Sequence, residues 1–130
     1  MPVWVFYCFL SEHGRDVIDD WYTGVSVGVQ VRFRTILQHL RDTPRLQWNP
    51  NLVYPITGER YRGLYEIRFQ VRNVLHRPLG FFGPDRGHFT LLMPAREQGN
   101  QFIPRNALET ARERMQIVMN DRRRICECRF

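Results

Sequence analysis

Arginine is the residue type with the clearest chemical consequence in this sequence. All 19 basic residues are arginine, against 13 acidic residues, and the net charge is +6. A guanidinium group stays charged and binds phosphate through paired hydrogen bonds, but it does not serve as an ordinary general base. This charge balance favours an anionic partner, namely nucleic acid, an acidic protein or an anionic membrane surface. A soluble domain with a merely basic surface is the alternative.

Several arginines fall in the segment that looks most like a β-sheet, GLYEIRFQVRNVLHRPLGFFGPDRGHFTLL, residues 63–92. Apolar and polar residues alternate over residues 64–72, which predicts a strand with one apolar and one polar face. An even spacing places Arg68 and Arg72 on the polar face. The arginines of this segment are Arg68, Arg72, Arg77 and Arg86. We expect them to form an RNA-facing surface; the alternative is a solvated face on which they pair with Glu66.

Two histidines near these arginines could transfer protons at neutral pH. His76 opens the second predicted strand of the segment and His88 opens the third. Each could be a catalyst or an ordinary surface histidine. Arg96 lies in the polar loop that follows, and Tyr61 lies in the loop before the segment, where it could stack on an RNA base.

Hydrophobic periodicity predicts an α+β fold with a small antiparallel sheet, two N-terminal helices and a C-terminal helix, all packed on one side. The C-terminal helix opens at Pro104 or Asn106, with Asn106 and Glu109 placed as a capping box. We expect one domain over residues 1–124 and a flexible tail over 125–130. The other predicted elements are a strand at 3–10, helices at 15–22 and 26–41, an irregular stretch at 42–62, a three-stranded meander within 64–93 and a loop at 95–103.

The cysteines indicate neither a metal site nor a disulfide. Cys8 lies in an apolar run and is expected to be a buried thiol, and Cys126 and Cys128 lack the second ligand pair that zinc needs. An odd number of cysteines suits a reducing cytoplasm. The apolar run at residues 3–10 is too short to cross a membrane and has no signal-peptide flanks. No cofactor and no membrane partner are expected.

The order of elements and three motifs resemble the RelE/HigB toxin superfamily, in particular its phage-derived HigB-like branch. GLYEIRF (63–69) is similar to the branch's G-L-[YW]-E-L-R strand, and HRPLGFF (76–82) is similar to a strand in which Arg77 matches a family arginine. The segment 87–115 resembles the ending of the family, with Leu91-Leu92, Pro104 and Ala111 on matching positions.

The resemblance implies a cytoplasmic toxin of a type II toxin–antitoxin pair, a ribosome-dependent mRNA endonuclease that needs no metal. It implies mRNA on the ribosome and a cognate helix-turn-helix antitoxin as partners, and it leaves a homo-oligomer open. The resemblance assigns Arg77 and Arg68 to catalysis. With His88 and Arg96, chosen for their chemistry and position, they are the candidate catalytic residues, and the candidate RNA-binding residues are Arg72, Arg86 and Tyr61.

The sequence also departs from the family pattern. Met93 stands at the position of a family histidine, and Arg96-Glu97-Gln98 replaces a lysine pair. These departures favour two alternatives, a non-catalytic RNA- or protein-binding module of phage origin and a ParE-like gyrase inhibitor on the same fold. The retained Arg68 and Arg77 favour the endonuclease.

Overall fold

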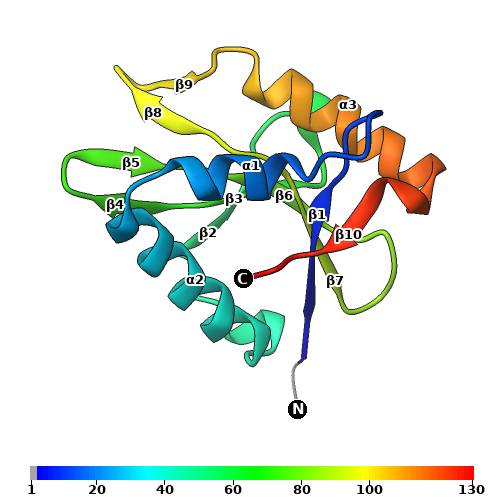
Figure 1. Cartoon of the computed structure of the whole chain (residues 1–130), viewed down its shortest axis with the longest axis horizontal. Coiled ribbons are helices and arrows are strands. Elements are labelled where there is room, and N and C mark those ends of the chain that lie inside the picture. The colour runs from blue at the N-terminus through cyan, green and yellow to red at the C-terminus, as the bar shows by residue number, and fades with distance from the viewer. Residues whose placement is uncertain (1–2) are drawn as a thin grey trace.

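The computed structural model describes residues 3–130, which form two β-sheets and three α-helices (Figure 1). The larger sheet has six strands in the order β10-β1-β7-β6-β3-β2, and the smaller has four in the order β4-β5-β8-β9. Strands β1 and β7 are parallel and the other pairs are antiparallel. The six strands of the larger sheet are β1 (Val5–Phe9), β2 (Val53–Pro55), β3 (Leu64–Ile67), β6 (Leu79–Phe82), β7 (His88–Met93) and β10 (Ile125–Glu127).

The smaller sheet consists of two hairpins, and both extend to the same side of the molecule (Figure 1). Its strands are β4 (Phe69–Val71), β5 (Val74–His76), β8 (Arg96–Gln98) and β9 (Gln101–Ile103). The sequence predicted a loop at residues 95–103, and this prediction is wrong. Gly99 and Asn100 both have positive φ, of 58° and 62°, and this backbone suits a tight two-residue hairpin turn.

Three strands of the larger sheet continue into the smaller one after a break of one or two residues. Strand β3 passes into β4 at Arg68, β5 passes into β6 at Arg77-Pro78, and β7 passes into β8 at Pro94-Ala95. We call this row of breaks the crease. The predicted meander is therefore confirmed as β3-β6-β7, but two of its strands are divided by the crease. In one of them the break falls at Pro78, which cannot donate a ladder hydrogen bond.

Helices cover both faces of the larger sheet. Leu91 packs with Phe33 under α1 (Val17–Gly24) and α2 (Val27–Arg41), whereas its neighbour Leu92 packs under α3 (Ala107–Asn120). Adjacent residues of a strand point to opposite faces, so α3 lies across the sheet from the other two helices. The α+β class and the three helices are confirmed, but the expectation that all helices share one side is wrong, because β7 is buried on both faces.

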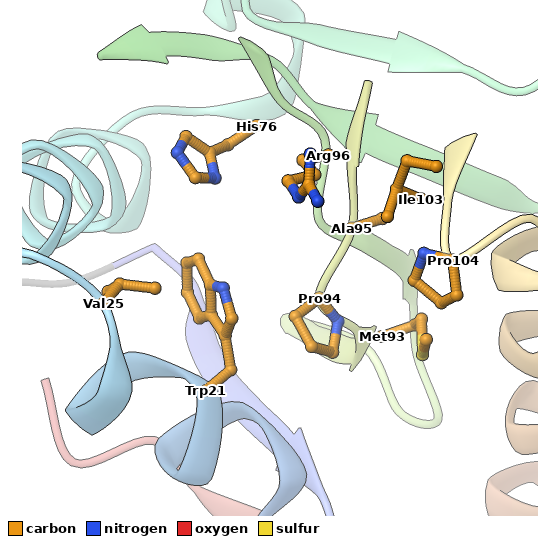
Figure 2. Close-up of a pocket in the computed structure, with 9 residues that line it drawn as sticks. All are labelled: Trp21, Val25, His76, Met93, Pro94, Ala95, Arg96, Ile103 and Pro104. Atoms are coloured by element: carbon orange, nitrogen blue, oxygen red, sulfur yellow. The ribbon is translucent and has the colours of Figure 1, made fainter. Parts of the chain in front are cut away.

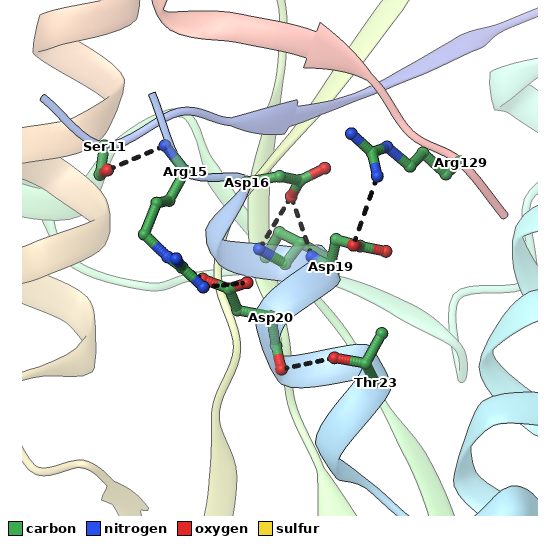
Figure 3. Close-up of polar contacts among 8 residues, drawn as sticks. Ser11, Arg15, Asp16, Asp19, Asp20, Thr23 and Arg129 are labelled. Carbon is green, nitrogen blue, oxygen red and sulfur yellow. Dashed lines mark hydrogen bonds and ion pairs between the residues drawn. The ribbon is translucent and has the colours of Figure 1, made fainter. Parts of the chain in front are cut away.

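The helix starts follow from local sequence only in part. Asp16 caps α1 by accepting from two backbone N–H groups (Figure 3), and Ser26 caps α2. Asn106 precedes α3 without a side-chain cap, so the predicted capping box is wrong. Glu109 instead accepts hydrogen bonds from Arg60 and from the Tyr61 hydroxyl, the latter at 3.2 Å.

The C-terminal segment is an integral part of the fold, and the prediction of a flexible tail over residues 125–130 is wrong. Strand β10 pairs with β1, and Phe130 stacks on Tyr22 with ring centroids 4.3 Å apart. Arg129 reaches Asp19 at the start of α1, at 3.9 Å (Figure 3). Apolar contacts with α1 and α2 therefore stabilise a segment whose own composition looked polar.

A disulfide joins Cys8 to Cys128, with a Cα–Cα distance of 5.3 Å. The prediction that Cys8 is a free thiol is wrong, because a sequence separation of 120 residues hides the proximity that the β1–β10 pairing creates. Cys126 is the free cysteine of the described chain. The inference of a reducing compartment rested on unpaired cysteines, and the disulfide removes that basis.

Candidate functional site on the four-stranded sheet

Two of the arginines assigned to catalysis meet at a buried carboxylate beside the crease. Glu66 is 4% exposed, and its carboxylate lies 2.6 Å from Nε of Arg77 and 3.7 Å from Nε of Arg68. Nη1 of Arg77 also donates to Glu97 at 3.0 Å, and its guanidinium lies 3.9 Å from the ring centroid of Phe102. Arg77 is thus held between two carboxylates and an aromatic ring.

The charges in this cluster balance. Two arginines face two carboxylates, and the Arg77 side chain is 15% exposed. The guanidinium of Arg68 is more accessible and lies over Tyr54, 4.9 Å from its ring centroid. The expected pairing of these arginines with Glu66 is therefore present, and Arg77 already has anionic partners without any phosphate.

A pocket opens on the other face of the smaller sheet, where His76 and Arg96 are opposite each other in the β5–β8 register. Arg96 and Glu97 are adjacent in β8, so they point to opposite faces. The pocket has a volume of 410 Å³, and Figure 2 shows the His76 ring and the Trp21 indole facing one another across it, near Arg96. Pro94 and Met93 also line this pocket, beside the crease.

His76 is the buried titratable group of this pocket. The residue is 7% exposed, and its ring stacks on Phe69 with centroids 5.1 Å apart. Burial lowers the pKa of His76, and the positive charge of Arg96 lowers it further. Both effects disfavour the imidazolium, so the ring is neutral at pH 7 and has a nitrogen able to accept a proton.

Arg96 is exposed and is not in an ion pair with any carboxylate of residues 3–130; its Nη1 makes a hydrogen bond of 3.4 Å to Gln98. Arg72 is exposed at the turn between β4 and β5, where it adopts a φ of 50°. Arg72 and Arg96 line a second, adjoining pocket together with His76. The arrangement offers two free guanidinium groups, a neutral imidazole and an indole on one accessible face.

The other three predicted site residues lie elsewhere. Arg86 and His88 lie at the turn that joins β6 to β7, at the end of these strands away from the crease. The His88 ring packs against Tyr7 with centroids 4.6 Å apart. Tyr61 packs beside α3, where its hydroxyl donates to Glu109. The structure therefore does not bring these three residues to the four-stranded sheet.

Sequence reasoning missed Trp21 as a wall of the pocket, and it left His76 undecided between catalyst and surface residue. Trp21 fits the apolar stripe of a short helix, and 55 residues separate it from His76, so no local pattern connects the two. Two prolines within the crease, Pro78 and Pro94, were the signal that strands are interrupted there.

Comparison with known proteins adds no relative. No protein-family model matches the chain, and neither the curated proteins nor the solved structures contain a match. Over residues 3–130, no helix is both long and apolar enough to cross a membrane. The same part of the chain holds no group of three or more His, Cys, Asp or Glu side chains placed to bind a metal ion.

Proposed function

We propose that the chain is a toxin of the RelE/HigB type that cleaves mRNA without a metal ion, and that RNA binds on the His76–Arg96 face of the smaller sheet. The observation that carries this proposal is the pocket in which a neutral histidine lies beside an unpaired arginine and an indole. Metal-independent cleavage of RNA needs a base for the 2′-hydroxyl and a cation for the crowded phosphate.

The roles in this proposal follow from the chemistry of each side chain. His76 accepts the 2′-hydroxyl proton, the 2′-oxygen attacks phosphorus, and the P–O5′ bond breaks to leave a 2′,3′-cyclic phosphate. The imidazolium then returns a proton to the departing 5′-oxygen. Arg96 stabilises the phosphate through paired hydrogen bonds, and Arg72 contacts the backbone of the RNA. Trp21 offers a face on which a base can stack.

The test is induced expression in bacterial cells, with primer extension on a reporter mRNA. We expect growth arrest and new mRNA ends with the wild type, and loss of both with Arg96→Ala and His76→Gln. Removal of a general base lowers cleavage by about 10²–10⁴-fold. Arg34→Ala is the matched control, because Arg34 is an exposed arginine of α2 without an ion pair in the described chain. No arrest at full soluble expression would refute an active toxin.

One observation favours a second candidate. Arg77, which the resemblance assigns to catalysis, is neutralised by Glu66 and Glu97. This favours the alternative in which the fold binds its target without cutting RNA, either as a binding module or as a ParE-like gyrase inhibitor. Growth arrest without new mRNA ends, together with inhibited DNA supercoiling by purified gyrase, would support the inhibitor. A helix-turn-helix gene next to this one would support a toxin–antitoxin pair in either case.

A further inference from the structure

A second groove lies at the opposite end of the β6 strand from the crease. It has a volume of 520 Å³ and runs between the C-terminal half of α3 and the adjoining ends of β3 and β6. Its apolar surface comes from Tyr65, Phe81, Phe82, Met115 and Met119. Met119 is 59% exposed, and methionine side chains adapt readily to flat aromatic ligands. The size suits a small molecule.

Arg45 lines this groove. Its guanidinium lies 3.8 Å from the ring centroid of Phe82, and its Nη2 donates to the Tyr65 hydroxyl at 2.6 Å. No carboxylate of residues 3–130 forms an ion pair with Arg45, so its remaining N–H groups are available to an anion. Phe82 and Tyr65 thus fix the position of the Arg45 guanidinium in the lining of an apolar groove.

A polar pocket of 370 Å³ adjoins the groove, and Arg45, Phe82 and Pro84 line both. Arg86 and His88 also line this pocket. Nδ1 of His88 is the one buried side-chain nitrogen or oxygen of the described chain that has no hydrogen-bond partner. Asp85 is present too, but Arg122 neutralises it at 2.7 Å. The pocket therefore holds two arginines without carboxylate partners beside an unsatisfied imidazole nitrogen.

From the groove and the pocket together we infer a nucleotide-binding site, distinct from the His76–Arg96 pocket. The base lies in the apolar groove between α3 and Tyr65, and the phosphate lies against Arg45 and Arg86. Charge complementarity decides the ligand class: an apolar slot for an aromatic ring leads directly to a pair of unpaired guanidinium groups, which bind phosphate oxygens well. The inference does not depend on the proposed cleavage at His76, because it uses none of the residues to which that mechanism gives a role; Arg86 and His88, candidates from the sequence, lie here instead of at the His76–Arg96 pocket.

Isothermal titration calorimetry of the full chain with each of the four ribonucleoside 5′-monophosphates tests this site. We expect saturable binding of at least one of them, weakened at least tenfold by Arg45→Gln and by Met119→Glu. Met119→Glu places a negative charge on an exposed position of the groove, so it should not disturb folding. Arg34→Ala serves as the matched control and should bind like the wild type, because Arg34 is an exposed arginine of α2 that lines neither proposed site. Circular dichroism of each variant verifies its fold.

Further titrations distinguish a free nucleotide from an RNA end and from phosphate alone as the ligand. Inorganic phosphate alone should bind at least tenfold more weakly than the nucleotide, and so should the nucleoside without phosphate. A 5′-phosphorylated oligoribonucleotide that binds more tightly than the mononucleotide identifies an RNA end as the ligand, and equal affinity identifies the free nucleotide; both support the site. Equal binding of inorganic phosphate and nucleotide would overturn it, as would no binding, or binding that Arg45→Gln leaves unchanged.

Discussion

The Cys8–Cys128 disulfide should contribute a large share of the stability of this protein. The bridge closes a loop of 120 residues, nearly the whole chain, and so restricts the unfolded state strongly. In the chain-entropy treatment a loop of this length corresponds to about 5 kcal/mol at 25 °C. That is comparable to the entire stability of many domains of this size, which is about 5–15 kcal/mol.

Urea denaturation followed by tryptophan fluorescence measures this effect. With a denaturant dependence of about 2 kcal/mol per molar urea, loss of 5 kcal/mol lowers the midpoint by about 2.5 M. We expect this shift on reduction and in Cys128→Ser. The slope should also rise, because the open chain exposes more surface when it unfolds. Midpoints that agree within 0.2 M with and without reductant, a margin of about 0.4 kcal/mol at this slope, would refute the reasoning.

Cys126→Ser is the control, and it should leave the midpoint unchanged under oxidising conditions because Cys126 is not in the bridge. Burial, together with the nearby Asp16 carboxylate, raises the pKa of the Cys126 thiol to about 11. The thiolate is the reactive form, so alkylation of the native protein at pH 8 should be slow. Thiols should therefore be counted in denaturant, where one free thiol per chain is the expected result and three would exclude the disulfide.

Three further predictions concern folding. Gly80→Ala places a Cβ 2.5 Å from a carbonyl oxygen of β7, so urea denaturation should show a loss of at least 1–3 kcal/mol, about the cost of overpacking; unchanged stability would contradict that contact. Arg77→Ala leaves the buried carboxylate of Glu66 short of its nearest cation and should cost about 3 kcal/mol by the same assay, whereas a loss below 1 kcal/mol would show a weakly coupled pair. The lowered pKa of His76 means that the unfolded chain takes up its proton at higher pH than the folded one, so stability present above pH 6.5 is lost as the pH falls below it. His76→Gln should flatten that part of the profile, and an unchanged profile would assign the loss to other groups.

Local patterns in the sequence predicted those elements in which apolar residues recur at helical spacing or alternate with polar ones. The stripe of Phe33, Leu37 and Leu40 predicted α2, and those residues are buried. The alternation over residues 64–72 predicted one strand, because its period continues unchanged across the break at Arg68. The short hairpin at residues 96–103 was missed because its composition is polar, and pairing with β5 stabilises it instead.

The parts of the site that sequence could not predict depend on contacts between distant residues. Arg68 and Arg77 both approach Glu66 because Arg68 follows β3 and Arg77 precedes β6, which are neighbours in the predicted meander. Their shared partner Glu66 was foreseen as an alternative, but the second carboxylate, Glu97, comes from a strand that was read as loop. His76 and His88 were both left open between catalyst and surface residue, and the structure places His76 in β5 and His88 at the far end of β7.

The crease determines how the smaller sheet can move relative to the rest of the fold. Backbone hydrogen bonds span it from Ile67 to Pro78 and from Arg77 to Ala95, at 3.0 and 2.8 Å, and the arginine–carboxylate cluster lies alongside. Three neighbouring strands are interrupted along one line and hydrogen-bonded to one another there, so we expect them to flex together. We therefore expect the smaller sheet to tilt as a rigid body about the crease, so that His76 and Arg96 move together. The width of the gap to Trp21, which lies on α1 outside the smaller sheet, then changes with such a tilt.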